Sequence, residues 1–289
     1  MIIAGFVVLF LILWAIFFAS LPALRHIGRR TAAFAARSAR VERIFSSADK
    51  RFRNYLPVVV IVVAGVLLTA WAGDMFLDLA VLVHSKSTAL ERVDTNIHDW
   101  AVTRRNGEAT MFFVAMTIIG GPLGLAVLLV AVAAVLAVKH RYRWLLYLTV
   151  TAGGGALLNL GLKHYFARSR PAVAEMLRRA HGYSFPSGHA MGAAVAFSAL
   201  AYLAMRSVHT WPVKAAILSL ALTLTAAVAL SRVYLGVHWL SDVGAGVTAG
   251  LVWVSSTTIA YETLRRIRVL RVMRRRGGAG EVVSAPPPA

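Results

Sequence analysis

Seven long apolar runs, separated by short polar segments, constrain the fold of this chain more than any other feature. The first, Met1–Leu24, carries no charged residue and is long enough to cross ~30 Å of hydrocarbon as a helix. Runs of this kind form helices in a bilayer because a helix satisfies its backbone polar groups internally. The other six cover residues 56–73, 110–138, 145–162, 189–205, 215–230 and 237–261. The sequence predicts an all-α, polytopic transmembrane helical bundle.

The positive charge of the chain is distributed as in a membrane protein. The net charge is +19, but most of the 31 basic residues lie in short segments between apolar runs, and 58% of the sequence is hydrophobic. This pattern follows the positive-inside rule and argues against a nucleic-acid partner. Because Arg25, Arg29 and Arg30 follow the first run and no charge precedes it, we expect an uncleaved anchor with its N-terminus outside.

The charge pattern also divides the chain into three parts. Residues 1–55 are predicted to form an N-terminal transmembrane anchor and a basic cytoplasmic segment, 56–262 a six-span domain, and 263–289 a basic, disordered cytoplasmic tail. The segment 74–109 has more acidic than basic residues, which favours the outer face. We expect His84 and His98 in this segment to be solvated.

Glycine and proline qualify two of the predicted spans. The span 110–138 should bend at Gly120-Gly121-Pro122, since proline lacks the amide hydrogen that a straight helix needs. In the span 145–162, the run Gly153-Gly154-Gly155 is typical of close helix packing. The chain contains no cysteine, which excludes disulfides and a thiol nucleophile.

The stretch Ser231–Asp242 places an arginine, a histidine and a carboxylate within apolar sequence. Burying a charged side chain at a helix centre costs at least ~2.5–3.5 kcal/mol unless a partner or water offsets it. Asp242 therefore needs a partner. On a helix, His238 lies one turn before it on the same face, so the two can form a hydrogen bond.

The predicted topology brings three polar clusters to the outer side of the membrane, and their composition suits a phosphate. Lys163, Arg170 and Arg232 offer positive charge, and an arginine fork matches phosphate oxygens. Ser187 and Gly188 open a helix, whose free amide groups attract anions. His238 can attack phosphorus while Asp242 fixes its tautomer, and His189 can act as acid and base. Each cluster alone has a simpler explanation, as interfacial cations, a helix start or a structural hydrogen bond.

Three motifs in this order resemble the signature of a known family. Lys163-x6-Arg170-Pro171, Pro186-Ser187-Gly188-His189 and Ser231-Arg232-x5-His238-x3-Asp242 are similar to those of the type 2 phosphatidic acid phosphatase superfamily, which also includes vanadium haloperoxidases. The resemblance covers about residues 56–262, and every defining position is matched. The first 55 residues are not covered by the resemblance.

The resemblance implies a helical phosphatase that uses neither a metal nor a cofactor and works through a phosphohistidine. It implies six membrane spans, so the N-terminal helix would be an additional seventh. By position, it makes His238 the nucleophile, Asp242 its orienting partner and His189 the acid and base. The phosphate-binding residues would be Lys163, Arg170, Ser187, Gly188 and Arg232.

The function expected on this basis is hydrolysis of a lipid phosphate or diphosphate at the outer face of a bacterial inner membrane. Candidates are undecaprenyl diphosphate, phosphatidylglycerol phosphate and phosphatidic acid, and the partners are membrane lipids. Arg178, Arg179 and His181 would suit a second phosphate, which favours a polyprenyl diphosphate. The alternatives are a lipid phosphotransferase with the same site and a non-catalytic lipid-binding or transport protein. The membrane spans disfavour a soluble haloperoxidase.

Overall fold

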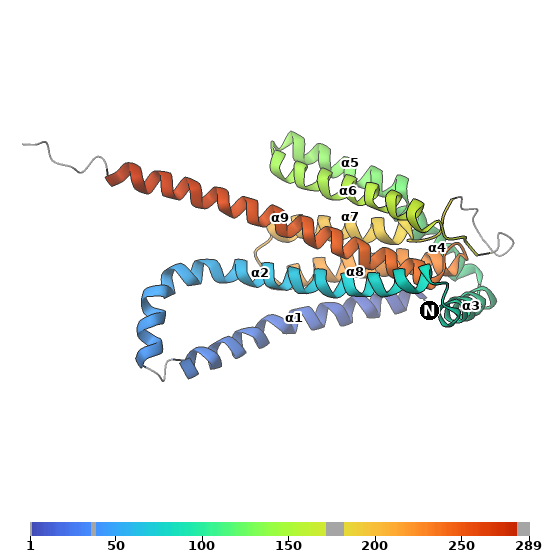
Figure 1. Cartoon of the computed structure of the whole chain (residues 1–289), viewed down its shortest axis with the longest axis horizontal. Coiled ribbons are helices and arrows are strands. Elements are labelled where there is room, and N and C mark those ends of the chain that lie inside the picture. Colours follow the sequence, from blue (N-terminus) through green and yellow to red (C-terminus); the bar gives the residue numbers. More distant parts are fainter. Residues whose placement is uncertain (1, 36–38, 172–181, 282–289) are drawn as a thin grey trace, which may run out of the picture.

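The computed structural model describes residues 2–35, 39–171 and 182–281, with side chains for 2–20, 62–171 and 182–269. This part of the chain is helical, contains no strand, and forms an elongated bundle (Figure 1). Its helices are α1 (Ile2–Ala35), α2 (Ala39–His84), α3 (Thr88–Thr103), α4 (Gly107–Ile119), α5 (Pro122–Val138), α6 (Tyr142–Phe166), α7 (Gly188–Ser207), α8 (Trp211–Tyr234) and α9 (Leu240–Glu281).

The predicted transmembrane bundle is confirmed. Six described helices are long and apolar enough to cross a membrane, and the pair α4 and α5 makes a seventh if it is counted as one bent span. The bend of 49° falls at the predicted glycines, where Gly121 precedes Pro122 as the cap of α5. Helix α2 covers the predicted second span, 56–73, and its apolar stretch continues beyond Gly73 to His84. Asp74 and Asp78 do not end it because both are exposed on the side of α2.

Helix α7 forms the centre of the bundle and packs against α6, α8 and α9. Its buried residues are mostly alanines, including Ala193, Ala196 and Ala199, which allow neighbouring helices to approach closely. The predicted packing role of the glycines in α6 holds for Gly154, where a Cβ atom would lie 2.3 Å from the Trp253 ring of α9. It does not hold for Gly153, which faces open space.

The chain directions gather the polar motifs at one end of the bundle. Helices α6 and α8 end there, α7 and α9 begin there, and α3 and α4 lie at the same end (Figure 1). The opposite end is basic. Arg206, Arg265 and Arg266 surround the buried carboxylate of Glu262 there, and Lys214 lies in the first turn of α8.

Both terminal regions extend the bundle. Helix α1 packs against α8, where the indole of Trp14 donates to the carbonyl of Pro212 at 3.1 Å and that of Trp211 to Phe17 at 2.8 Å. Helix α9 continues through Glu281, so the predicted disordered tail is corrected for residues 263–281. Between Gly250 and Gly277 this helix contains no glycine or proline, whereas residues 282–289 lie outside the described part.

Candidate active site

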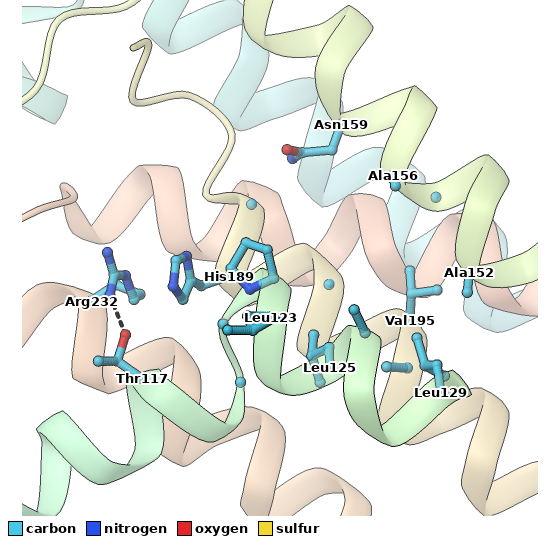
Figure 2. A pocket seen from close by; sticks show the side chains of 18 of the residues that line it. Thr117, Leu123, Leu125, Leu129, Ala152, Ala156, Asn159, His189, Val195 and Arg232 are labelled. Carbon is cyan, nitrogen blue, oxygen red and sulfur yellow. Dashed lines mark hydrogen bonds between the residues drawn. The ribbon is translucent and has the colours of Figure 1, made fainter. Parts of the chain in front are cut away.

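A cavity of about 770 Å³ opens at the polar end of the bundle, between the α4–α5 bend and helices α6, α7 and α8. Figure 2 shows that the cavity has a polar and an apolar part. His189 and Arg232 lie in the polar part, and Leu129, Ala152 and Val195 line the apolar part. Six residues predicted from the motifs line its polar part: Lys163, Arg170, Gly188, His189, Arg232 and His238. The cavity therefore suits an amphiphilic ligand with an anionic head.

His238 lies in the turn between α8 and α9 and is 2% exposed. Its Nδ1 atom lies 3.3 Å from a carboxylate oxygen of Asp242, and its Nε2 atom lies 2.9 Å from Nη1 of Arg170. Burial, followed by the positive charges of Arg170, Arg232 and Lys163, lowers the pKa of the imidazole well below 6.5. The ring is thus neutral at pH 7, and the atom that faces the cavity is Nε2.

Asp242 lies behind His238 and is fully buried in the first turn of α9. One of its oxygens accepts from the backbone amide of Trp239 at 3.0 Å and faces His238. The other accepts from Nη1 of Arg168 at 2.7 Å. The carboxylate is therefore held on both sides and cannot turn without breaking contacts.

The three motif cations reach the cavity from different elements. Lys163, in the last turn of α6, donates to the carbonyl of Tyr183 at 2.8 Å. Arg170 donates to the carbonyls of Gly182 at 2.9 Å and Val237 at 2.8 Å, which ties its loop to the His238 turn. Arg232, in the last turn of α8, is 5% exposed and donates to the hydroxyl of Thr117 in α4 (Figure 2).

The start of α7 supplies the remaining motif residues. Ser187 is the N-cap by position, but its side chain makes no capping bond, contrary to the expected role. Its buried hydroxyl has no hydrogen-bond partner among the described residues, and its backbone amide donates to the carbonyl of Asp242 at 2.9 Å. A Cβ atom on Gly188 would lie 2.9 Å from the Asn159 amide oxygen, so only glycine fits there without displacing it.

The structure also corrects and extends the sequence prediction. His98 is 3% exposed, not solvated, because its ring packs against Trp239 with centroids 5.5 Å apart. Sequence reasoning missed Arg168 and Asp94, which form a buried ion pair at 2.9 Å beside Asp242. The residues suggested for a second phosphate, Arg178, Arg179 and His181, lie outside the described residues.

The fold and the cavity define a class: a multi-pass membrane protein with a cationic, histidine-containing site at one end of a helical bundle. The family model described as PAP2 superfamily matches residues 143–266. Phosphatidylglycerophosphatase B of Bacillus subtilis (strain 168) is 32% identical over 200 residues, which are 67% of this chain and 94% of that protein. The chain belongs to the PAP2 superfamily, the family its motifs resemble.

Two further comparisons agree with this family membership. The crystal structure of a transmembrane PAP2 type phosphatidylglycerolphosphate phosphatase from Bacillus subtilis superimposes with a TM-score of 0.62 at 30% identity, covering 68% of this chain and 96% of that one. A protein of Escherichia coli (strain K12), named provisionally as an undecaprenyl-diphosphatase, is 34% identical over 105 residues, 35% of this chain and 48% of its own. The protein is a membrane phosphatase that acts on lipid phosphates, which sets aside the non-catalytic alternative.

Proposed function

We propose that the chain hydrolyses a lipid phosphate through a covalent phosphohistidine on His238. The observation that supports this most strongly is the two-sided environment of the imidazole, with Nδ1 toward Asp242 and Nε2 toward the cationic part of the cavity. A carboxylate that accepts from Nδ1 fixes the tautomer whose lone pair is on Nε2. That lone pair is the nucleophile.

The first step transfers the phosphoryl group to the enzyme. Arg170 releases Nε2 of His238 and turns its guanidinium to the phosphate oxygens, a fork geometry that arginine favours. The nitrogen–phosphorus bond forms as the bond between phosphorus and the lipid oxygen breaks. His189, which takes up a proton once the negative phosphate offsets the neighbouring cations, donates that proton to the leaving oxygen. The ring gains positive charge, which Asp242 stabilises through Nδ1–H.

The second step returns the enzyme to its starting state. Water attacks phosphorus, His189 accepts a proton from it, and the nitrogen–phosphorus bond breaks to release inorganic phosphate and a neutral His238. Charge on the transferring group is stabilised by Lys163, Arg170 and Arg232, together with Ser187, Gly188 and the amide groups at the start of α7. Because three fixed cations supply this charge, we expect hydrolysis to proceed without a metal ion.

The apolar half of the cavity would hold the lipid end of the substrate. It runs between α5, α6 and α7 from the phosphate-binding residues toward Leu129 and Val195 (Figure 2). Such a lining would accept acyl chains of a membrane lipid without exposing them to water. Phosphatidylglycerophosphatase B of Bacillus subtilis, which matches 67% of this chain, is named for phosphatidylglycerophosphate, and we propose this lipid as the leading substrate.

The charge distribution supports an active site on the outer face of a bacterial inner membrane. The end opposite the cavity carries Arg206, Lys214 and Arg265, and cytoplasmic ends of helices are enriched in such residues. The chain has no cysteine, so single cysteines can be introduced as reporters. We expect an impermeant maleimide applied to intact cells or spheroplasts to label Asp99→Cys and spare Lys214→Cys. Labelling in the reverse pattern would overturn the orientation.

Release of phosphate from purified lipid phosphates in detergent tests the function. The panel should contain phosphatidylglycerol phosphate, phosphatidic acid and undecaprenyl diphosphate, with His238→Ala as the control. We expect release by the native chain and none by the variant. Addition of an acceptor lipid distinguishes hydrolysis from phosphotransfer, because a phosphotransferase would form phosphorylated acceptor at the expense of free phosphate. If the native chain hydrolyses none of these lipids, the proposal is wrong.

A further inference from the structure

Arg168 bridges two buried carboxylates that lie far apart in the sequence. Its Nη1 atom lies 2.7 Å from Asp242 and its Nη2 atom 2.9 Å from Asp94 of α3. The side chain of Arg168 is 15% exposed, and those of Asp94 and Asp242 are 2% and 0% exposed. Ion pairs this well shielded from water interact much more strongly than surface pairs.

Asp94 also binds the first turn of the helix that carries Asp242. One of its oxygens accepts from the backbone amide of Ser241 at 2.9 Å, and the other accepts from the Ser241 hydroxyl at 2.5 Å. Asp94 of α3 therefore caps the start of α9, in the turn of helix that follows His238. The same Ser241 hydroxyl lies 2.7 Å from Nη1 of Arg168, so the four groups form one hydrogen-bonded network.

The charges of this network matter for the proposed reaction. A neutral imidazole does not offset the charge of Asp242, whereas Arg168 does. With Asp94 included, the three ionised groups carry a net charge of about −1 behind His238. The imidazole becomes positive as the nitrogen–phosphorus bond forms, so a residual negative charge on this side favours the transition state over the ground state.

We propose that Asp94 and Arg168 are positioning residues for catalysis, which hold Asp242 in the orientation and charge state that His238 requires. This inference rests on the proposed function, since it assigns the two residues to the reaction at His238. Neither residue lines the cavity. Their effect should therefore appear in kcat and leave KM nearly unchanged.

Substitutions at the two positions test the proposal in the full-length, detergent-purified enzyme with phosphatidylglycerol phosphate. We expect Arg168→Gln to lower kcat about 10²-fold, as for other losses of active-site positioning. Asp94→Asn should lower kcat roughly tenfold or more, by analogy with the loss when a hydrogen-bond partner of a metal-bound residue is removed. Arg168→Lys keeps the charge but not the fork, and should retain more activity than Arg168→Gln.

The double variant Asp94→Asn/Arg168→Gln shows whether the two residues affect kcat together, as one network, or independently of each other. Arg168→Gln leaves Asp94 buried without its cation, and removal of that second charge should relieve the defect. The double variant should therefore be no less active than Arg168→Gln alone. Asp99→Asn and Arg104→Gln are matched controls, since both residues are exposed at the same end of α3, and they should behave like the native enzyme.

Thermal unfolding of each variant distinguishes positioning from loss of fold. Variants that unfold near the native temperature, yet lose kcat at constant KM, support the proposal. If Asp94→Asn does not fold, the proposal is tested by comparing the kcat of Arg168→Lys with that of Arg168→Gln. The proposal is wrong if folded Arg168→Gln has the kcat of the native enzyme. It is also wrong if the loss of kcat in the double variant equals the product of the two single losses. The proposed function fails separately, if the native enzyme and His238→Ala release phosphate equally.

Discussion

Nη1 of Arg170 lies 2.9 Å from Nε2 of His238, so a cation contacts the ring atom that we propose attacks phosphorus. The contact helps to keep the imidazole neutral, because burial and then the positive charge of Arg170 lower the pKa of the ring. A neutral imidazole is the nucleophilic form. The same arginine can then follow the phosphate, since its fork suits phosphate oxygens as well as a ring nitrogen.

The lowered pKa of His238 predicts how stability depends on pH. In the unfolded chain this histidine binds a proton below about pH 6.5, whereas in the folded chain it stays neutral to a much lower pH. Stability is thus unaffected above pH 6.5 and falls below it, by up to ~1.4 kcal/mol per pH unit. Thermal unfolding between pH 8 and 5 should show this fall, and His238→Gln should reduce it. Equal slopes for both would contradict the assignment.

Arg232 should contribute to phosphate binding in the transition state. Removal of its charge in Arg232→Gln is expected to lower kcat/KM by roughly 10²–10³-fold, as for other groups that stabilise developing charge. Thr117→Val keeps the shape of the side chain that accepts from Arg232 and should cost less, about tenfold. Steady-state kinetics with one lipid phosphate measures both. A larger loss in Thr117→Val than in Arg232→Gln would argue against this role of Arg232.

The apolar half of the cavity should determine the response to substrate chain length. Ala156 lines the cavity, whereas its neighbour Leu157 is 72% exposed on α6. We expect Ala156→Phe to raise KM for a long-chain lipid phosphate and to affect a short-chain analogue little. Leu157→Phe adds an aromatic ring outside the cavity and should change neither KM. An equal effect of Ala156→Phe on both substrates would place the lipid chain elsewhere.

Adjacent glycines of α6 provide a matched test of the packing. A Cβ atom at Gly154 would lie 2.3 Å from the Trp253 ring, and one at Gly153 would meet nothing within 4 Å. The Trp253 indole is held in place by its hydrogen bond to the carbonyl of Thr151 at 2.8 Å. Gly154→Ala should therefore lower stability by ~1–3 kcal/mol, as overpacking does, whereas Gly153→Ala should not. Comparison of the two unfolding temperatures in one detergent checks this.

Much of the architecture could be predicted because each membrane-spanning helix is encoded by its own stretch of apolar sequence. A run of apolar residues long enough to span the bilayer is a helix irrespective of its neighbours, and glycine with proline at 120–122 bends it. The order of the spans then placed Lys163, His189 and His238 at one end. The topology alone thus predicted which distant segments meet, and these three residues line one cavity.

The network behind His238 could not be predicted because it depends on how α3 packs. Asp94 lies in a segment whose acids indicated only the outer face of the membrane, and it is buried where it meets Ser241 and Arg168. One signal was available: an ionised Asp242 needs a cation, and a neutral His238 does not supply one. Arg168, inside the first motif, would have satisfied that requirement.

The proposed function depends on a covalent phosphohistidine at His238, and rapid-quench labelling can detect this intermediate. The native enzyme is mixed with lipid whose terminal phosphate carries ³²P and is quenched in alkaline detergent, since phosphohistidine survives base and is lost in acid. We predict acid-labile label in a peptide that contains His238, and none in His238→Ala. Turnover without labelled enzyme at any quench time, or label that persists in His238→Ala, would contradict the claim.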